Sequence, residues 1–257
     1  MMRVALVTGA SSGMGLIYAR QLAERGYDLL LVSNQEKELI QAAADIADGF
    51  GVSAIPHYQD LAAGDAAEAL FDYCKAEDFE VDILVNNAGM FFFKELCADD
   101  ISRVEKMMSL HMLTVTKLSL LFGEEMKRRR QGRILIVSSM AAKLPTPGIT
   151  IYSATKAYLS SFGKSLYFEM RPYGVHVTTV CPAAIATPLY GLKPELMRLA
   201  VGTGIIKTPE WLVRRALRGL FRNRPTVRPG LMNVYLPPMI ALLPRGVENR
   251  IWLGLRR

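Results

Sequence analysis

Short apolar runs alternate with stretches of helical periodicity along most of this chain. The apolar runs predict strands at 3–8, 28–33, 53–57, 82–86, 133–138 and 175–180. The stretches between them predict helices at 14–25, 36–48, 65–76, about 99–130 and 152–171. Strands that alternate with helices form a parallel sheet with helices on both faces. The pattern therefore predicts an α/β fold with a doubly wound parallel β-sheet, whose ligands collect at the carboxyl ends of the strands.

Composition agrees with a single domain of this kind. The chain has 257 residues, of which 51% are hydrophobic, and α/β chains of this length often bury one large core. Its three cysteines, Cys74, Cys97 and Cys181, show no metal-ligand spacing, so we predict no metal site and a reduced, cytoplasmic setting. The apolar run at 1–7 is too short for a secretion signal, and we interpret it as a strand.

The first predicted strand leads directly into a glycine-rich turn, Thr8-Gly9-Ala10-Ser11-Ser12-Gly13-Met14-Gly15. A strand, a glycine turn and a helix start together form a cradle for phosphate, because amide groups and the helix dipole face the anion. Gly9 permits the tight turn, Gly13 lets the backbone approach a pyrophosphate, and Gly15 allows the helix to pack closely. A purely structural turn is the alternative, but three glycines at this spacing favour dinucleotide binding.

A second motif places Tyr152 and Lys156 four residues apart, with Ser139 thirteen residues before the tyrosine. In a helix, residues four apart lie on one face, so the lysine ammonium is expected beside the phenol. A phenol normally ionises near pH ~10, and a neighbouring cation favours the phenolate. Such pairs are common on helix surfaces, but together with the glycine turn this one predicts a proton donor and acceptor for hydride-transfer chemistry.

These motifs resemble the short-chain dehydrogenase/reductase family, whose glycine pattern is Thr-Gly-x-x-x-Gly-x-Gly. The resemblance runs from Arg3 to about Tyr190 and includes Asn86-Asn87-Ala88-Gly89 and the segment 181–187. It implies a Rossmann-type fold and an enzyme that interconverts a ketone and a secondary alcohol with NAD(P)(H). In that reaction, Tyr152 passes the proton, Ser139 hydrogen-bonds the reacting oxygen, and Lys156 holds the cofactor ribose. Ser138 competes for the oxygen contact, although the thirteen-residue interval matches the family better for Ser139.

The resemblance also implies a set of cofactor-binding residues at the carboxyl ends of the strands. They are Gly9, Ser11, Ser12, Gly13, Met14, Gly15, Ser33, Asn34, Asp60, Leu61, Asn87, Ala88, Gly89, Tyr152, Lys156, Pro182, Ala183, Ile185 and Thr187. Asp60 takes the place of an aspartate that contacts the adenine amino group, with a turn or helix-cap role as the alternative. Thr187 resembles the threonine that binds the nicotinamide carboxamide, and Ala183 replaces the usual glycine after Pro182.

The preference between the two nicotinamide cofactors depends on the end of the second strand. That end reads Val32-Ser33-Asn34-Gln35, without the acidic residue that holds the ribose of NAD and repels the extra phosphate of NADP. Family members that prefer NADP often carry an arginine at the position of Asn34 or of Ser12, and neither residue is basic here. Ser33, Asn34 and Lys37 nevertheless offer hydrogen bonds or charge to a 2′-phosphate. NADP(H) is therefore favoured over NAD(H). A polar loop without a binding role is the alternative.

One position departs from the family pattern. The family commonly has an asparagine in the long helix, where it helps to hold a water in the proton relay from the lysine, and this chain has His111 there. An imidazole donates and accepts hydrogen bonds and titrates near neutrality, which makes His111 a relay candidate. A histidine that is satisfied within the helix core is the other reading, and the sequence favours neither.

The C-terminal part of the chain is strongly basic. Residues 207–257 contain eleven Lys and Arg against two acids, a net charge of +9, whereas the first 206 residues carry −2. We divide the chain into a core at 1–190, a substrate lid at 188–206 and a basic, apolar extension of the same domain at 207–257. A subunit interface with a solvated basic face and a peripheral contact with an anionic membrane are the two interpretations of this extension. No recognition motif accompanies the charge, so nucleic acid is not an expected partner.

The expected substrate is a lipophilic carbonyl or alcohol, such as a steroid or a 3-oxoacyl chain. The candidate pocket residues are Met90, Phe91, Phe92, Phe93, Met140, Leu144, Leu189, Tyr190, Leu192 and Met197. Core or subunit contacts would explain the same residues. A dinucleotide-binding regulator without catalysis is the rival function, but such proteins usually show damage at the tyrosine or lysine. The resemblance further implies a homodimer or homotetramer.

Overall fold

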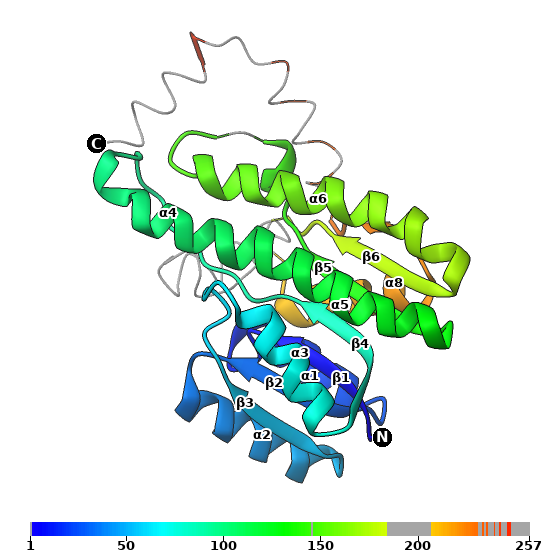
Figure 1. Ribbon diagram of the computed structural model, residues 1–257. Coiled ribbons are helices and arrows are strands. Elements are labelled where there is room, and N and C mark those ends of the chain that lie inside the picture. Colours follow the sequence, from blue (N-terminus) through cyan, green and yellow to red (C-terminus); the bar gives the residue numbers. More distant parts are fainter. Residues whose placement is uncertain are drawn as a thin grey trace.

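A single sheet of seven parallel strands forms the centre of the computed structural model (Figure 1). The structure describes residues 2–144, 146–183 and 207–230, with isolated positions after 230. The strand order is β3-β2-β1-β4-β5-β6-β7, and every neighbouring pair is parallel. The predicted doubly wound α/β fold is confirmed. The predicted lid at 188–206 lies outside the described residues, and so do the predicted cofactor-binding residues Ile185 and Thr187.

The central strands are largely apolar because both faces of the sheet are covered, whereas the edge strand β3 is partly exposed. They are β1 (Met2–Thr8), β2 (Asp28–Ser33), β3 (Ala54–Tyr58), β4 (Phe79–Asn86), β5 (Gly132–Val137), β6 (Val175–Val180) and β7 (Thr226–Val227). Helices α1 (Gly13–Ala23), α2 (Glu36–Phe50) and α8 (Pro209–Phe221) pack on one face. Helices α3 (Ala66–Ala76), α5 (Thr114–Arg129) and α6 (Thr150–Met170) pack on the other.

The long predicted helix is divided in the structure. It begins with the short turn η1 (Ala98–Asp100) and continues as α4 (Ile101–Met108), a single π-helical turn η2 (Ser109–Leu113) and α5. A π-helical turn holds one more residue than an α-helical turn and is often found at functional sites. His111 lies in this wide turn. Figure 1 shows α4 and α5 running almost end to end beside α6.

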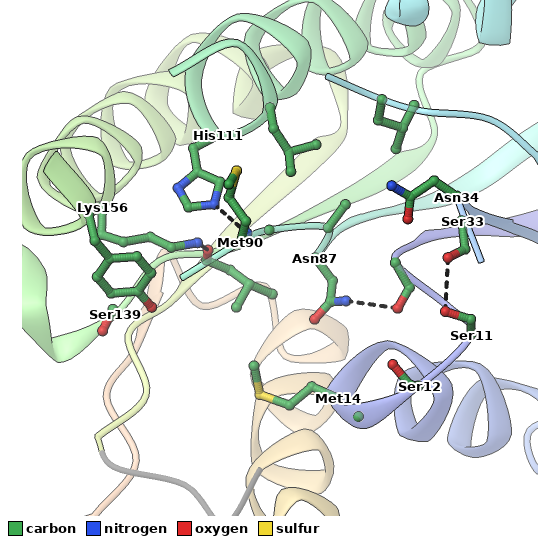
Figure 2. A pocket seen from close by; sticks show the side chains of 18 of the residues that line it. Ser11, Ser12, Met14, Ser33, Asn34, Asn87, Met90, His111, Ser139 and Lys156 are labelled. Atoms are coloured by element: carbon green, nitrogen blue, oxygen red, sulfur yellow. Dashed lines mark hydrogen bonds between the residues drawn. The ribbon is translucent and has the colours of Figure 1, made fainter. Parts of the chain in front are cut away.

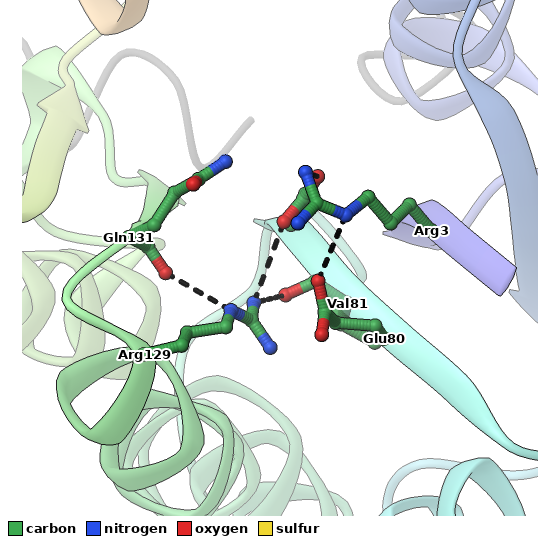
Figure 3. A network of polar contacts seen from close by, with 6 residues as sticks. Arg3, Glu80, Val81, Arg129 and Gln131 are labelled. Atoms are coloured by element: carbon green, nitrogen blue, oxygen red, sulfur yellow. Dashed lines mark hydrogen bonds and ion pairs between the residues drawn. The ribbon is translucent and has the colours of Figure 1, made fainter. Parts of the chain in front are cut away.

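A polar network fastens the edge of the sheet at which the strands begin (Figure 3). Arg3 Nε lies 3.0 Å from Glu80 Oε1, which joins β1 to β4. Arg129, at the end of α5, donates to the carbonyl groups of Val81 and Gln131, and its guanidinium lies 3.7 Å from the carboxylate of Asp82. This network therefore links β1, β4 and α5 on the side remote from the carboxyl ends of the strands.

Candidate active site

A cavity of about 620 Å³ lies over the carboxyl ends of the strands. With the exception of Gly15, all described residues that we predicted for the site line this cavity. They are Gly9, Ser11, Ser12, Gly13, Met14, Ser33, Asn34, Asp60, Leu61, Asn87, Ala88, Gly89, His111, Ser139, Tyr152, Lys156, Pro182 and Ala183. In Figure 2, Ser139 and Lys156 lie at one end of this cleft, whereas Ser11, Ser33 and Asn34 lie at the other. The exception, Gly15, is buried beside the turn.

The glycine turn between β1 and α1 has the conformation that a phosphate cradle requires. Gly9 and Gly13 adopt φ angles of +66° and +56°, a region that favours glycine. A Cβ atom on Gly15 would lie 1.9 Å from the carbonyl oxygen of Gly9, so only glycine allows α1 to approach the turn. A Cβ atom on Gly13 would meet nothing within 4 Å, which leaves open space above the first turn of α1. A pyrophosphate group fits this arrangement.

Hydrogen bonds hold this turn against the end of β4. Thr8 Oγ1 donates to the carbonyl of Val85 at 3.1 Å and accepts from the amide groups of Asn87 and Ala88 at 2.9 and 3.0 Å. The side-chain amide of Asn87 donates to the carbonyl of Thr8 at 2.9 Å and to that of Gly9 at 3.4 Å. The two strand ends therefore form one rigid wall of the cleft.

A network of hydroxyl groups closes the opposite end of the cleft. Ser11 Oγ lies 2.8 Å from Ser33 Oγ and donates to the side-chain carbonyl of Gln35 at 2.7 Å, whereas Asn34 is exposed. The residues from Ser33 to Gln35 include no acidic side chain. Each hydroxyl has one proton, so Ser33 donates to Ser11 and Ser11 donates to Gln35. The side-chain amides of Asn34 and Gln35 are the uncharged donors at this end of the cleft, where a carboxylate would favour NAD.

Asp60 also lines this end of the cleft. Its carboxylate accepts a hydrogen bond from the amide of Ala62 at 3.1 Å and pairs with Lys106 Nζ at 3.0 Å. Burial raises the pKa of Asp60, but the hydrogen bonds from Ala62 and Lys106 outweigh that effect and lower the pKa below its ordinary value. The bond to Ala62 is the turn role that the sequence left open, and adenine contact stays a prediction.

Helix α6 carries Tyr152 and Lys156 into the other end of the cleft. Lys156 Nζ donates to the carbonyl of Val137 at 2.9 Å and lies 5.6 Å from the centre of the Tyr152 ring. Burial lowers the pKa of Lys156 to about 8. An ammonium group has three protons to donate, so Lys156 retains donor capacity for a ligand beyond its bond to Val137.

The two adjacent serines have different surroundings. Ser138 Oγ is buried and donates to the main-chain carbonyl of Lys156 at 2.7 Å. Ser139 begins the short helix η3 (Met140–Lys143), and its Oγ accepts from the amide of Ala141 at 3.1 Å. The proton of the Ser139 hydroxyl is thus not used in that bond, and the side chain faces the cleft (Figure 2). The geometry agrees with Ser139 rather than Ser138 as the serine that meets a substrate oxygen.

An apolar cluster adjoins Tyr152. The ring of Phe91 packs edge to face on the Tyr152 ring, with 5.0 Å between the ring centres. Phe92 is buried with Met107 in the same cluster, whereas Phe93 is half exposed. Among the described residues that were predicted as apolar pocket lining, only Met90 lines the cavity, and Phe91, Phe92, Phe93, Met140 and Leu144 do not.

Several lining residues were not predicted from the sequence: Gln35, Gln59, Lys106, Leu110, Val137 and Ser138 as a wall residue. Lys106 and Leu110 are four residues apart and share a helix face, but neither lies three or four residues from His111, so the choice of His111 would not have indicated them. In the part of the chain that the structure describes, no cluster of His, Cys, Asp and Glu is arranged to hold a metal ion.

The fold and the grouping of Ser, Tyr and Lys side chains define the class of oxidoreductases that act on CH–OH groups. A family model described as short chain dehydrogenase matches residues 3–195, and the chain belongs to this family. The chain is 32% identical over 260 residues to a very-long-chain 3-oxoacyl-CoA reductase from Homo sapiens, covering 98% of this chain and 79% of the relative.

Two further comparisons bear on the site. A short-chain dehydrogenase from Sphingobium yanoikuyae, solved in complex with NADPH, superposes with a TM-score of 0.79 at 29% identity and covers 98% of this chain and 95% of its own. Inactive hydroxysteroid dehydrogenase-like protein 1 from Homo sapiens is 32% identical over 193 residues, which is 73% of this chain and 57% of the relative. The chain is thus similar both to reductases and to a relative without activity.

Proposed function

We propose that this protein is an NADP(H)-dependent oxidoreductase that interconverts a ketone and a secondary alcohol on a lipophilic substrate. One observation carries the proposal: Ser139, Tyr152 and Lys156 line the same cavity as the glycine turn. The turn accounts for the dinucleotide, and the three side chains account for proton transfer at a neighbouring oxygen.

The proposed chemistry assigns one task to each side chain. The bound dinucleotide supplies or accepts the hydride. Tyr152 gives the proton to the carbonyl oxygen or takes it from the alcohol, and Ser139 donates a hydrogen bond to that oxygen. Lys156 holds the ribose hydroxyl groups with the protons that Val137 leaves available, and its charge favours the phenolate of Tyr152.

The cofactor preference rests on the hydroxyl network of Ser11, Ser33 and Gln35. A 2′-phosphate meets the side-chain amides of Asn34 and Gln35 beside this network and no carboxylate, and the structural relative that binds NADPH supports the same choice. The variant Asn34→Asp introduces a carboxylate at this end of the cleft. We expect it to weaken NADPH binding at least ~10-fold relative to NADH because like charges repel. Equal loss for both cofactors would contradict the preference.

The substrate class is inferred from the cleft wall and from the relatives. Met90 and Leu110 line the cavity with apolar side chains, and Phe91 packs on the Tyr152 ring in the adjoining apolar cluster. Relatives that are 3-oxoacyl-CoA reductases favour a 3-oxoacyl thioester over a steroid as the first substrate to test. Both are lipophilic ketones, so a panel that includes each class decides between them.

The test is a fluorescence titration with NADPH and NADH, followed by assays on 3-oxoacyl-CoA esters of increasing chain length and on ketosteroids. Wild-type protein is expected to bind NADPH more tightly and to reduce at least one substrate. Tyr152→Phe should lose turnover by ~10²-fold or more while NADPH binding remains, because only the proton donor is removed. Retained turnover in this variant would remove Tyr152 from its proposed role.

A dinucleotide-binding regulator is the second candidate function, and the similarity to an inactive relative supports it. It predicts NADPH binding without turnover of any substrate in the panel. The complete Ser, Tyr and Lys set in this cleft favours the enzyme.

We further infer that the protein forms a homo-oligomer. We also infer that it lies in the cytoplasm and contacts the membrane surface peripherally. Exposed apolar side chains on α4, α5 and α6, namely Ile101, Leu120 and Phe168, support a subunit interface. Arg214, Arg215 and Arg218 on the outer face of α8 support attraction to anionic lipid. Among the described residues, no helix has the length and apolar character to cross a membrane. Light scattering and flotation with anionic and neutral vesicles test the two inferences separately.

A further inference from the structure

His111 is fully buried between the end of β4 and helix α6. The amide of Met90 donates to His111 Nε2 at 2.9 Å, a bond drawn in Figure 2, and His111 Nδ1 lies 3.0 Å from Thr155 Oγ1. Thr155 Oγ1 in turn donates to the carbonyl of Tyr152 at 2.9 Å. Both ring nitrogens are thus engaged, and the chain of bonds ends on the backbone of the proposed proton donor.

These contacts fix the protonation of the ring. The amide of Met90 can only donate, so Nε2 accepts and carries no proton. The single proton of a neutral imidazole therefore lies on Nδ1 and is donated to Thr155 Oγ1. The Thr155 hydroxyl donates its own proton to the main-chain carbonyl of Tyr152. Burial and the nearby charge of Lys156 lower the pKa of His111 well below its ordinary value. A second ring proton would also point at the amide of Met90. The imidazole therefore has no free position from which to relay a proton near neutrality.

We propose that His111 is a positioning residue, a neutral imidazole that holds the cofactor-facing segment at Met90 in a fixed relation to the turn of α6 that carries Tyr152. This inference rests on the proposed function, because it assigns the fixed relation to the reaction of Tyr152 with a bound dinucleotide. It replaces the relay interpretation with a structural connection between the segment after β4 and helix α6.

The packing around the ring supports this role. The rings of His111 and Tyr152 meet edge to face with 5.9 Å between their centres. A Cβ atom on Gly89 would lie 3.0 Å from His111 Nε2, so the imidazole fills the space beside this segment. The wide turn η2 places residue 111 toward the cavity, where an α-helical turn would set it in a different direction. His111 therefore contacts the cleft segment and the catalytic helix at once.

Two amide substitutions separate the two connections. In His111→Gln, the side-chain amide reaches the position of Nε2, so it accepts from the amide of Met90 but loses the bond to Thr155. In His111→Asn, the shorter side chain reaches only the position of Nδ1, so it keeps the bond to Thr155 but loses the bond to Met90. We expect His111→Asn chiefly to raise the dissociation constant and KM for NADPH. We expect His111→Gln chiefly to lower kcat. A misplacement of about 1 Å costs up to ~10²-fold, so effects of ~10- to 100-fold are expected.

Thr155 provides a matched control. Thr155→Val removes the hydroxyl with little change of shape and should lower kcat as His111→Gln does, whereas Thr155→Ser should restore it. The double variant His111→Gln with Thr155→Val should lose no more than either single variant, because both break the same connection. Additive losses, or equal effects of His111→Asn and His111→Gln on KM and kcat, would overturn the proposal.

Two measurements separate positioning from proton relay and from loss of folding. The pH profile of kcat in the variants should keep the shape of the wild-type profile, since a positioning residue changes its height only. In wild-type protein labelled with ¹⁵N-histidine, the His111 resonances, assigned by their absence in His111→Asn, should show a proton on Nδ1 and no titration near neutral pH. A proton on Nε2, or titration there, would refute the proposal even if the variants fail to fold. If the wild type binds NADPH without turnover, the proposed function fails, but the NMR and NADPH-binding results still test the connection.

Discussion

The hydroxyl of Ser138 donates a hydrogen bond of 2.7 Å to the main-chain carbonyl of Lys156. This bond joins the end of β5 to the second turn of α6. Both serines line the cavity, but this bond uses the proton of Ser138, whereas Ser139 Oγ accepts from the amide of Ala141 and keeps its proton for a ligand. Two serines that are indistinguishable by residue type thus serve different purposes.

The serine pair gives a first prediction. Ser139→Ala should lower kcat by ~10²-fold, the usual loss for one hydrogen-bond donor to a reacting oxygen, and should leave stability nearly unchanged. Ser138→Ala should lower the free energy of unfolding by about 1–2 kcal/mol, because the carbonyl of Lys156 loses a buried partner. Steady-state kinetics and urea unfolding of both variants provide the comparison, and a reversal of the two patterns would exchange the assignments.

A second prediction concerns the buried lysine. Burial lowers the pKa of Lys156 to about 8, below the value of ~10.4 expected in the unfolded chain. Between these two pH values the unfolded chain binds more protons than the folded one, so stability from this group rises with pH. Relative to Lys156→Met, the wild type should therefore gain up to about 3 kcal/mol between pH ~8 and ~10.4. Urea unfolding of both proteins across this pH range tests the prediction. A constant difference in the free energy of unfolding would show that the pKa of Lys156 is not lowered.

The glycine turn yields a third prediction. Gly15→Ala forces a Cβ atom to within 1.9 Å of the Gly9 carbonyl oxygen, and displacement of α1 should cost about 3 kcal/mol of stability. Gly13→Ala meets no neighbour and should cost only about 1–2 kcal/mol, from its left-handed backbone. Both should weaken NADPH binding, the first by moving the cradle and the second by filling it. Thermal unfolding without cofactor should therefore separate the two variants, and equal losses would refute the packing role of Gly15.

A fourth prediction uses two adjacent arginines. Arg129 is mostly buried and bonds to Val81 and Gln131, so Arg129→Met should lower the free energy of unfolding by about 2 kcal/mol. Arg128 pairs with Glu125 on the surface, and Arg128→Met should change it by at most about 1 kcal/mol. Neither variant should alter NADPH affinity, because the network lies on the opposite edge of the sheet. An altered affinity in Arg129→Met would indicate that this edge is coupled to the cleft.

The sequence predicted the parts of the fold that depend on local pattern. The limits of β2 and β6 agree with the structure to the residue, because each is a short run rich in apolar and β-branched residues that follows a glycine, Gly26 or Gly174. We did not predict α8, although its buried residues Leu212, Val213, Ala216, Leu217 and Leu220 have helical spacing and Thr208 caps its first turn. We also missed β7, whose two residues are defined by pairing with Thr179 and Val180. Such a pairing is tertiary and leaves no periodicity to detect.

The site shows the same division. The glycine turn and the spacing of Ser139, Tyr152 and Lys156 are local patterns, and the structure places these residues on one cavity. The partners of His111 could not be predicted, because Met90 and Thr155 meet it only after β4 and α6 pack together. Lys106 was missed because its importance comes from Asp60, which is distant in the sequence.

The wide turn η2 sets the angular phase between two helical segments. Each residue of an α-helix adds a rotation of about 100°, and the wide turn absorbs one extra residue without rotating the flanking helices, so the sequence patterns of α4 and α5 are out of phase by that amount. Lys106 on α4 can thereby face the cleft while Leu118 and Phe122 on α5 face the sheet. Deletion of one residue from 109–113 would leave a regular helix with the faces of α4 and α5 almost unchanged, but it would remove the wide turn in which His111 lies, so the chain's length at this point is itself part of the site.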